Sequence, residues 1–358
     1  MPQVRGSIIG ALVPLLGPII LLLLICVIAT LVDDRPLNTT VTGALVRIVI
    51  LVGLYVFVGN SGVISFGSMA FVAIGAYAMA AQTCCARLKP MTMTGLPDFL
   101  KYHTYPVPPA VLVSGVLAAS AALIIGRPIM GLSGIPSSIA TFMVLGILNV
   151  AFRNWDSITL GESSIVGLPM FVNVWIAFAW ALLALVVAYL HQRSRYGLML
   201  QATREDEVAA RAAGIRVPTV RLIAWVISAF LLGIGGSLYG SYVGVISVNA
   251  FYLDLTFITL AMLVVGGMRS MFGAVVGVIT LSALTEVLRQ FERGIAIGSI
   301  HIVMPSGFQE VLLGLVMLVV LVKFPRGITR GKEFSLDHLL NLVRRRMPPR
   351  LPASSEAR

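Results

Sequence analysis

Charged residues are scarce in this sequence. Of its 358 residues, only 11% are Asp, Glu, Lys or Arg, whereas a soluble domain typically carries about 25%. Apolar residues make up 58% of the chain and its mean hydropathy is +0.95, so polar groups could not cover its surface in water. The composition therefore excludes a soluble enzyme and an intrinsically disordered chain, and it favours a membrane protein.

Cysteine, histidine and nucleotide-binding motifs are also poorly represented. The three cysteines include the adjacent pair Cys84 and Cys85, and because vicinal cysteines bridge only with strain, we expect packing residues and no disulfide scaffold. The four histidines have no second ligand at helical or loop spacing, which argues against a metal site. No G-x-x-x-x-G-K-[ST] motif occurs, so this chain is expected to hold no cofactor, and any ATP must be bound by another chain.

Long apolar runs are what the sequence has instead. A helix needs about 20 residues to cross a hydrocarbon layer roughly 30 Å thick, and about ten runs approach that length. The first run is too long for a signal peptide and has no A-x-A cleavage site after it. We expect an all-α, polytopic bundle of transmembrane helices with about ten spans (8–10). The expected spans are 8–31, 41–58, 63–82, 108–126, 133–152, 170–191, 219–243, 255–268, 271–288 and 307–323.

One of these runs is ambiguous. Residues 255–268 are few for a span and end at a Gly-Gly pair. This run either crosses a locally thinned bilayer or forms a tight hairpin with 271–288.

Basic residues outnumber acidic ones, 26 to 15, for a net charge of +11. In a soluble protein this excess would suggest a nucleic-acid partner, but in a membrane protein basic residues gather in cytoplasmic loops. If both termini are cytoplasmic, the inside segments hold more than twice as many basic residues as the outside segments, and the acidic residues divide almost evenly. The charge distribution therefore predicts cytoplasmic termini and no nucleic-acid partner.

The segments between spans are too short to bury a core of their own. We expect one transmembrane domain over residues 1–323, with its largest cytoplasmic loop at 192–218. Residues 324–358 form a basic cytoplasmic tail with an Arg-Arg-Arg run at 344–346. This tail is expected to be attracted to the anionic lipid of the bilayer and to be partly disordered.

Glycines recur in one span at helical spacing. Gly236, Gly240 and Gly244 share one face, where a missing side chain lets another backbone approach closely. The pattern predicts helix packing, and the same close contact would also let helices slide during a transport cycle.

A second glycine-rich segment separates two apolar runs. Residues 59–68 have the sequence Gly-Asn-Ser-Gly-Val-Ile-Ser-Phe-Gly-Ser. The segment is either an ordinary cytoplasmic turn or a broken helix that lines a polar path. Spacing alone leaves both open.

The largest inside loop contains a short helical pattern at 204–214. Acidic residues lead it, Arg211 stands at (i, i+4) from Glu207, and Gly214 marks a helix stop. An exposed, charged helix of this kind is either a docking element or a solvated connector.

This loop resembles a motif of bacterial ABC importer permeases. Ala209-Ala210-x-x-x-Gly214, with Glu207 just ahead, is similar to the E-A-A-x-x-x-G loop that contacts the ATPase subunit. The wider sequence is similar to the second permease subunit of branched-chain amino-acid importers over about 40–330. Further segments carry this resemblance, in the family's order: Gly59-Asn60-Ser61-Gly62, Ser65-Phe66-Gly67, Gly75-Ala76-Tyr77, 202–236, Gly266-Gly267 with Gly273 and Gly277, and Phe324-Pro325-Arg326-Gly327.

The chain also departs from the family pattern. Glu207-Val208-Ala209 replaces a strict Glu-Ala-Ala, Arg269 stands where glycine is expected after the Gly-Gly pair, and 159–162 replaces a Gly-Gly-containing turn. These changes leave open whether the acidic residue contacts the ATPase and which solute is carried.

The resemblance implies a membrane subunit with separate partners. These are a second related permease subunit, two cytoplasmic ATPase subunits that bind ATP and Mg, and a periplasmic solute-binding protein, at the bacterial inner membrane. Hydrolysis in the ATPases would push on the coupling loop and switch the spans between outward and inward access, so the chain itself is not an enzyme. The residues expected at the ATPase contact are Glu207, Ala209, Ala210, Arg211 and Gly214.

The solute is a weaker expectation. Members of the family carry branched-chain amino acids, and others carry urea, short amides or aromatic acids. A neutral amino acid suits a glycine-lined cavity, and candidates for the translocation path are Asn60, Ser61, Ser65 and Ser68.

Three ionisable residues fall within the expected spans. Arg47, Glu286 and Glu310 are all placed near the outer edge, and snorkelling toward the interface is the favoured interpretation. An ion-coupled carrier would need an acidic group at mid-membrane, and a membrane-embedded enzyme would need paired catalytic groups; the sequence offers neither.

Overall fold

The computed structural model describes residues 8–32, 34–84, 89–292, 295–297, 300–302, 308–323 and 327–329. Each of the ten expected spans coincides with a helix, which confirms an all-α polytopic architecture. These helices are α1 (Ile8–Val32), α2 (Arg35–Ser61), α3 (Ser68–Thr83), α6 (Val107–Ile129), α7 (Ile135–Arg153), α9 (Val174–Arg193), α12 (Val217–Val243), α13 (Leu253–Gly266), α14 (Met271–Glu292) and α15 (Phe308–Lys323).

Eight apolar helices in the described part of the chain are long enough to cross a bilayer. One of the eight is α13 counted together with the 3-10 turn before it, as Asn249–Gly266. The two others, α3 and α15, have 16 residues each, fewer than the roughly 20 needed. The number of long helices thus lies at the lower end of the expected range. Residues 1–7 and most of the expected tail at 324–358 lie outside the described residues.

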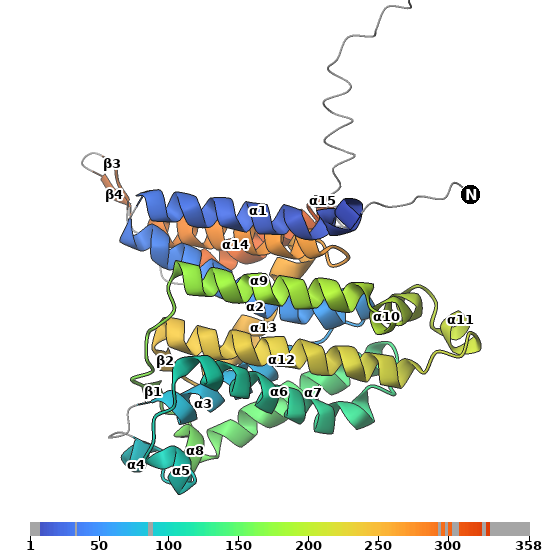
Figure 1. Ribbon diagram of the computed structural model, residues 1–358. Helices are drawn as coiled ribbons and strands as arrows, with labels where there is room; N and C mark the ends of the chain where they lie inside the picture. The colour runs from blue at the N-terminus through green and yellow to red at the C-terminus, as the bar shows by residue number, and fades with distance from the viewer. Residues whose placement is uncertain are drawn as a thin grey trace, which may run out of the picture.

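Shorter elements gather at the two ends of the bundle. Figure 1 shows α10 and α11 at one end, and β1, β2, β3, β4, α4 and α5 at the opposite end. Because α10 and α11 fall in the expected cytoplasmic loop, the opposite end is the outer one in the predicted orientation. The short elements are α4 (Lys89–Thr92), α5 (Asp98–Lys101), α8 (Asp156–Thr159), β1 (Ile165–Val166), α10 (Arg195–Glu205), α11 (Glu207–Ala212), β2 (Val245–Ile246), η1 (Asn249–Phe251), β3 (Ile295–Ile297) and β4 (Ile300–Ile302). The strands form two antiparallel pairs, β1 with β2 and β3 with β4.

The core is built around α2 and α12, which pack against each other and against α3, α6, α9 and α14. Almost every side chain of α2 from Leu45 to Ser61 is buried. Trp225 of α12 is fully buried, with its ring edge-on to Phe57 at 4.9 Å and to Phe71 at 5.2 Å between centroids. Such T-shaped pairs add to the free energy gained from burying the rings. Cys26 and Cys84 are buried, as expected of packing residues.

The three glycines that the sequence places on one face of α12 have different surroundings. A Cβ on Gly236 would lie 2.0 Å from the carbonyl oxygen of Val72, so α3 approaches here at backbone distance. Gly240 instead meets side chains of Ile246 and Leu168, at 3.2 Å each. Gly244 lies beyond the helix and caps it in the left-handed region, at φ 78°.

The ambiguous run at 255–268 forms a hairpin. Helix α13 ends at Gly266, Gly267 adopts φ 118°, and α14 begins at Met271. A Cβ on Gly277 would lie 2.0 Å from the carbonyl oxygen of Met262, which explains how the two helices of the hairpin can lie so close.

Large apolar side chains also cover the outer surface of the bundle. On α1, α6 and α7, exposed residues include Ile20, Ile124 and Ile147. A soluble monomer rarely exposes contiguous apolar surface of this extent, whereas a lipid environment accepts it.

Candidate functional site

The expected coupling segment folds as two short helices with defined ends. Asp206 separates α10 from α11, and its carboxylate accepts hydrogen bonds from the backbone N–H groups of Val208 at 2.9 Å and Ala209 at 3.0 Å. This is an N-cap, which satisfies N–H groups that have no partner within the helix. The sequence pattern predicted one short helix at 204–214, and the cap explains why the chain bends within it.

Gly214 ends α11, as the sequence predicted. It adopts φ 83°, its N–H donates to the Arg211 carbonyl at 3.0 Å, and the N–H of Ile215 donates to the Ala210 carbonyl at 3.1 Å. This pair of bonds is a Schellman motif, in which glycine avoids the strain of the left-handed region.

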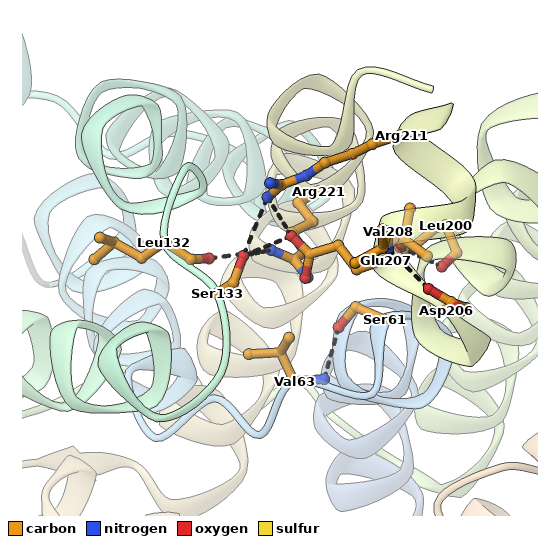
Figure 2. Close-up of polar contacts among 11 residues, drawn as sticks. Ser61, Val63, Leu132, Ser133, Leu200, Asp206, Glu207, Val208, Arg211 and Arg221 are labelled. Atoms are coloured by element: carbon orange, nitrogen blue, oxygen red, sulfur yellow. Dashed lines mark hydrogen bonds and ion pairs between the residues drawn. The ribbon is translucent and has the colours of Figure 1, made fainter. Parts of the chain in front are cut away.

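The carboxylate of Glu207 anchors α11 to the membrane helices. It accepts hydrogen bonds from Ser133 Oγ at 2.6 Å and from the guanidinium of Arg221 at 2.9 Å, as Figure 2 shows. Arg221 belongs to α12, and its side chain is only 4% exposed. The same guanidinium donates to the carbonyl of Leu132 at 3.0 Å, so α11 is joined to α12 and to the α6–α7 loop.

The electrostatics of this anchor favour the charged carboxylate. Partial burial raises the pKa of Glu207, but the hydrogen bonds from Ser133 and Arg221 and the charges of Arg221 and Arg211 outweigh it, so its pKa lies below the usual range. The expected (i, i+4) pair with Arg211 is also present.

A second connection joins α10 to the C-terminal end of α2. Arg204 donates to the carbonyl oxygen of Gly59 at 2.6 Å, and its side chain packs on Gly62, where a Cβ would lie 2.6 Å from Arg204 Cγ. Glu205 pairs with both Arg204 and Arg269. The hydrogen bonds from Arg269 and Arg204 lower the pKa of the exposed Glu205 carboxyl. Arg269, which stands where glycine was expected, therefore links the α13–α14 turn to α10.

The glycine-rich segment after α2 lies directly beside the coupling segment. The helix ends at Ser61, Gly62 adopts φ 73°, and α3 begins at Ser68. The loop in between is held by Ser138, whose hydroxyl donates to the Ile64 carbonyl at 2.8 Å. A Cβ on Gly67 would lie 2.2 Å from the Thr141 carbonyl oxygen. The segment is thus a tightly packed turn between the C-terminal end of α2 and the N-terminal ends of α3 and α7.

The four residues proposed for the translocation path are all buried in this turn. Asn60 accepts a hydrogen bond from Gln201 of α10 at 3.2 Å, Ser68 bonds Ser65 at 3.0 Å, and Ser61 accepts from the Val63 N–H at 3.2 Å. Their polar groups face partners within the chain. That they line a solute path stays a prediction.

The residues expected at the ATPase contact divide between the two faces of α11. Glu207 faces Arg221 and Ser133, and Ala210 is buried. Ala209, Arg211 and Gly214 are exposed. Sequence reasoning missed Val208, whose side chain is 79% exposed. An exposed apolar residue between charged neighbours is the signal that would have identified it.

Arg47 and Glu286 both line a cavity of about 520 Å³ between α2, α12 and α14. That their charged groups snorkel toward the interface stays a prediction. Glu286 also pairs with Arg289, three residues further along α14, at 3.7 Å. Nothing is described of the side chain of Glu310.

Comparison with known proteins is consistent with this arrangement. LivM of Escherichia coli, a high-affinity branched-chain amino acid transport system permease protein, is 25% identical over 92% of this chain and 77% of its own length. A probable branched-chain amino acid transport permease protein, LivH of Methanocaldococcus jannaschii, is 27% identical over 53% of this chain and 56% of its own. The autoinducer 2 import system permease protein LsrC of Salmonella typhimurium is 26% identical over 61% of this chain and 62% of its own.

No solved structure shows a significant match to the chain. The family described as branched-chain amino acid transport system / permease component matches residues 35–321. This match spans α2 to α15 and includes the coupling segment, and the chain therefore belongs to this family of membrane permeases.

Proposed function

We propose that this chain is a permease subunit of an ATP-driven importer in the bacterial inner membrane. It pairs with a second related permease subunit, receives solute from a periplasmic binding protein and is driven by two cytoplasmic ATPase subunits that bind ATP and Mg. Residues 1–323 form the transmembrane domain, the loop 192–218 contacts the ATPase, and 324–358 form a basic cytoplasmic tail. Both termini are cytoplasmic.

One observation carries the proposal: α10 and the capped, exposed α11 lie at one end of the bundle, and each of them is bonded to a membrane helix through an arginine. Arg221 of α12 holds Glu207 of α11, and Arg204 of α10 holds the end of α2. A solvated connector needs neither link. A force on the exposed face of α11 reaches α12 and α2 through these hydrogen bonds, as a coupling element requires, provided that the ATPase binds it differently in the two access states.

The solute is a branched-chain amino acid in this proposal, because relatives with that printed function match the largest share of the chain. The similarity to an autoinducer 2 permease makes a different small solute the second candidate.

Co-purification tests the coupling role. The chain is co-expressed with candidate ATPase subunits from the same organism, and the ATPase retained on a tag carried by the chain is measured for wild type and Val208→Glu. Because Val208 is 79% exposed on α11, we expect Val208→Glu to release most of the ATPase without unfolding the bundle.

Val166→Glu is the matched control, since Val166 is 59% exposed in β1 at the opposite end. It should retain the ATPase as wild type does. Equal retention by all three proteins would contradict the assignment of α11. Sodium- or proton-driven uptake by the isolated chain in liposomes would contradict an ATP-driven importer altogether.

A further inference from the structure

The cavity between α2, α12 and α14 contains charge deep within the bundle. The sequence places Arg47 near the outer edge of a span at 41–58, but α2 begins at Arg35, so Arg47 lies near the midpoint of this 27-residue helix. An ionisable residue within a span is costly and marks functional paths by default. Around it lie Ser282, Glu286 and Arg289 of α14 and Tyr239 and Tyr242 of α12. At about 520 Å³, the cavity is within the range of small-molecule sites.

The guanidinium of Arg47 makes one long hydrogen bond to the described part of the chain. Among the described residues its hydrogen-bond partner is Ser282 Oγ, at 3.5 Å. A guanidinium has five N–H donors, so several of them can serve a ligand in the cavity. Arginine binds carboxylates in a bidentate manner, with hydrogen bonds that are stronger than neutral ones.

The charges lining the cavity do not balance. Among the described lining residues Glu286 is the one carboxylate, and it lies 3.7 Å from Arg289, so it has to offset the charges of both Arg289 and Arg47. One positive charge therefore remains, and an anion would satisfy it. The side chain of Arg289 is half-exposed, so the cavity extends from the outer end of the bundle inward to Arg47.

We propose that this cavity binds the carboxylate of a small solute, with Arg47 as its ligand. In the context of the proposed function, the cavity is a site at which an amino acid pauses after entering from the outer side, and this part of the inference rests on that function. The cavity then favours carboxylate-bearing solutes over uncharged ones such as urea.

A cysteine at the cavity wall provides the test. Thr40 lines the cavity, and Thr40→Cys is introduced into the full chain after its three native cysteines are replaced by serine. The protein is placed in phosphatidylcholine nanodiscs, and the rate of reaction with anionic or cationic methanethiosulfonate reagents is measured. L-leucine and isocaproate, which carry a carboxylate, should protect the thiol, whereas leucinol, which lacks one, should not.

Arg47→Gln should raise the concentration of isocaproate needed for half protection about tenfold or more, the value of one charged hydrogen bond. It should slow the anionic reagent and speed the cationic one, whereas unfolding would speed both. Arg35→Gln is the matched control, because Arg35 is exposed at the start of the same helix, and it should behave as wild type.

Three results would overturn the proposal. They are equal protection by leucinol and isocaproate, an unchanged half-protecting concentration in Arg47→Gln, and protection by phosphatidylglycerol alone, which would assign the cavity to a lipid headgroup. The assay needs no ATPase and no transport. If the wild-type chain does not bind the ATPase but carboxylates still protect the thiol, the proposed function is wrong and the carboxylate site stands. If the chain binds the ATPase but carboxylates do not protect the thiol, only the site is wrong.

Discussion

Glu207 connects the short helix α11 to the membrane domain through a single carboxylate. Its partner Arg221 is almost wholly buried, so removal of the negative charge leaves a buried cation with neutral partners only. We expect Glu207→Gln to weaken docking of α11 by about 1–3 kcal/mol, since a hydrogen bond to a charged group is worth about that much. Hydrogen exchange of the α11 amides should then rise about tenfold or more.

Arg211→Gln is the matched control for this variant. The exposed (i, i+4) pair of Arg211 with Glu207 is of a kind worth only about 0.3–0.5 kcal/mol, so exchange should change little. Equal effects of the two substitutions would show that the link to Arg221 does not hold α11.

The pH dependence of exchange gives a second readout of the same variant. Because the folded-state pKa of Glu207 is lowered, its stabilisation is present above the ordinary glutamate value of about 4.3 and is lost as pH falls through the lower folded value. The α11 amides of the wild type should therefore stay protected from hydrogen exchange between about pH 7 and 5. Their exchange should approach that of Glu207→Gln only below about pH 4.3. Loss of protection near pH 6 would contradict the anchor.

At the scale of elements, backbone contact between α12 and α3 limits what the bundle tolerates. A Cβ on Gly236 would lie 2.0 Å from the Val72 carbonyl oxygen, a contact that no side-chain rotation relieves. We expect Gly236→Ala to push the helices apart and to cost about 1–3 kcal/mol, as overpacking does. The measurement is the thermal unfolding midpoint in detergent.

Gly146→Ala provides the comparison for Gly236→Ala. Gly146 lies in α7 with nothing within 4 Å of an added Cβ, so alanine should be neutral or stabilise by up to about 1 kcal/mol through helix propensity. Similar midpoints for the two variants would mean that α12 and α3 can separate without loss.

These contacts also show how far the sequence predicts the structure. Helices, the α13–α14 hairpin and the stop at Gly214 follow from apolar runs and local glycine chemistry, which act over a few residues. The inward direction of Glu207 depends on Arg221 and on Ser133, which is 74 residues away in sequence. The cavity at Arg47 depends on three helices meeting. No pattern in the neighbouring sequence predicts either of these tertiary arrangements.

At the scale of the whole molecule, two features locate a membrane. Apolar side chains are exposed around α1, α6 and α7, and the short elements lie at opposite ends of the bundle (Figure 1). The arginines bonded to the coupling segment, Arg204, Arg221 and Arg269, gather at one of these ends. Since basic residues favour the cytoplasmic side, this end faces the cytoplasm in the orientation that the proposed function requires.

Cysteine labelling from the two sides of the membrane tests that orientation. Val208→Cys in α11 and Val166→Cys in β1 are both exposed positions, and each is placed in a chain without its native cysteines. A membrane-impermeant maleimide should label Val166→Cys in spheroplasts and Val208→Cys only in inverted vesicles, because an odd number of spans separates the two ends. The reverse pattern would place α11 outside, where no ATPase could reach it. Labelling of both positions from one side would mean that the two ends of the bundle do not face opposite compartments.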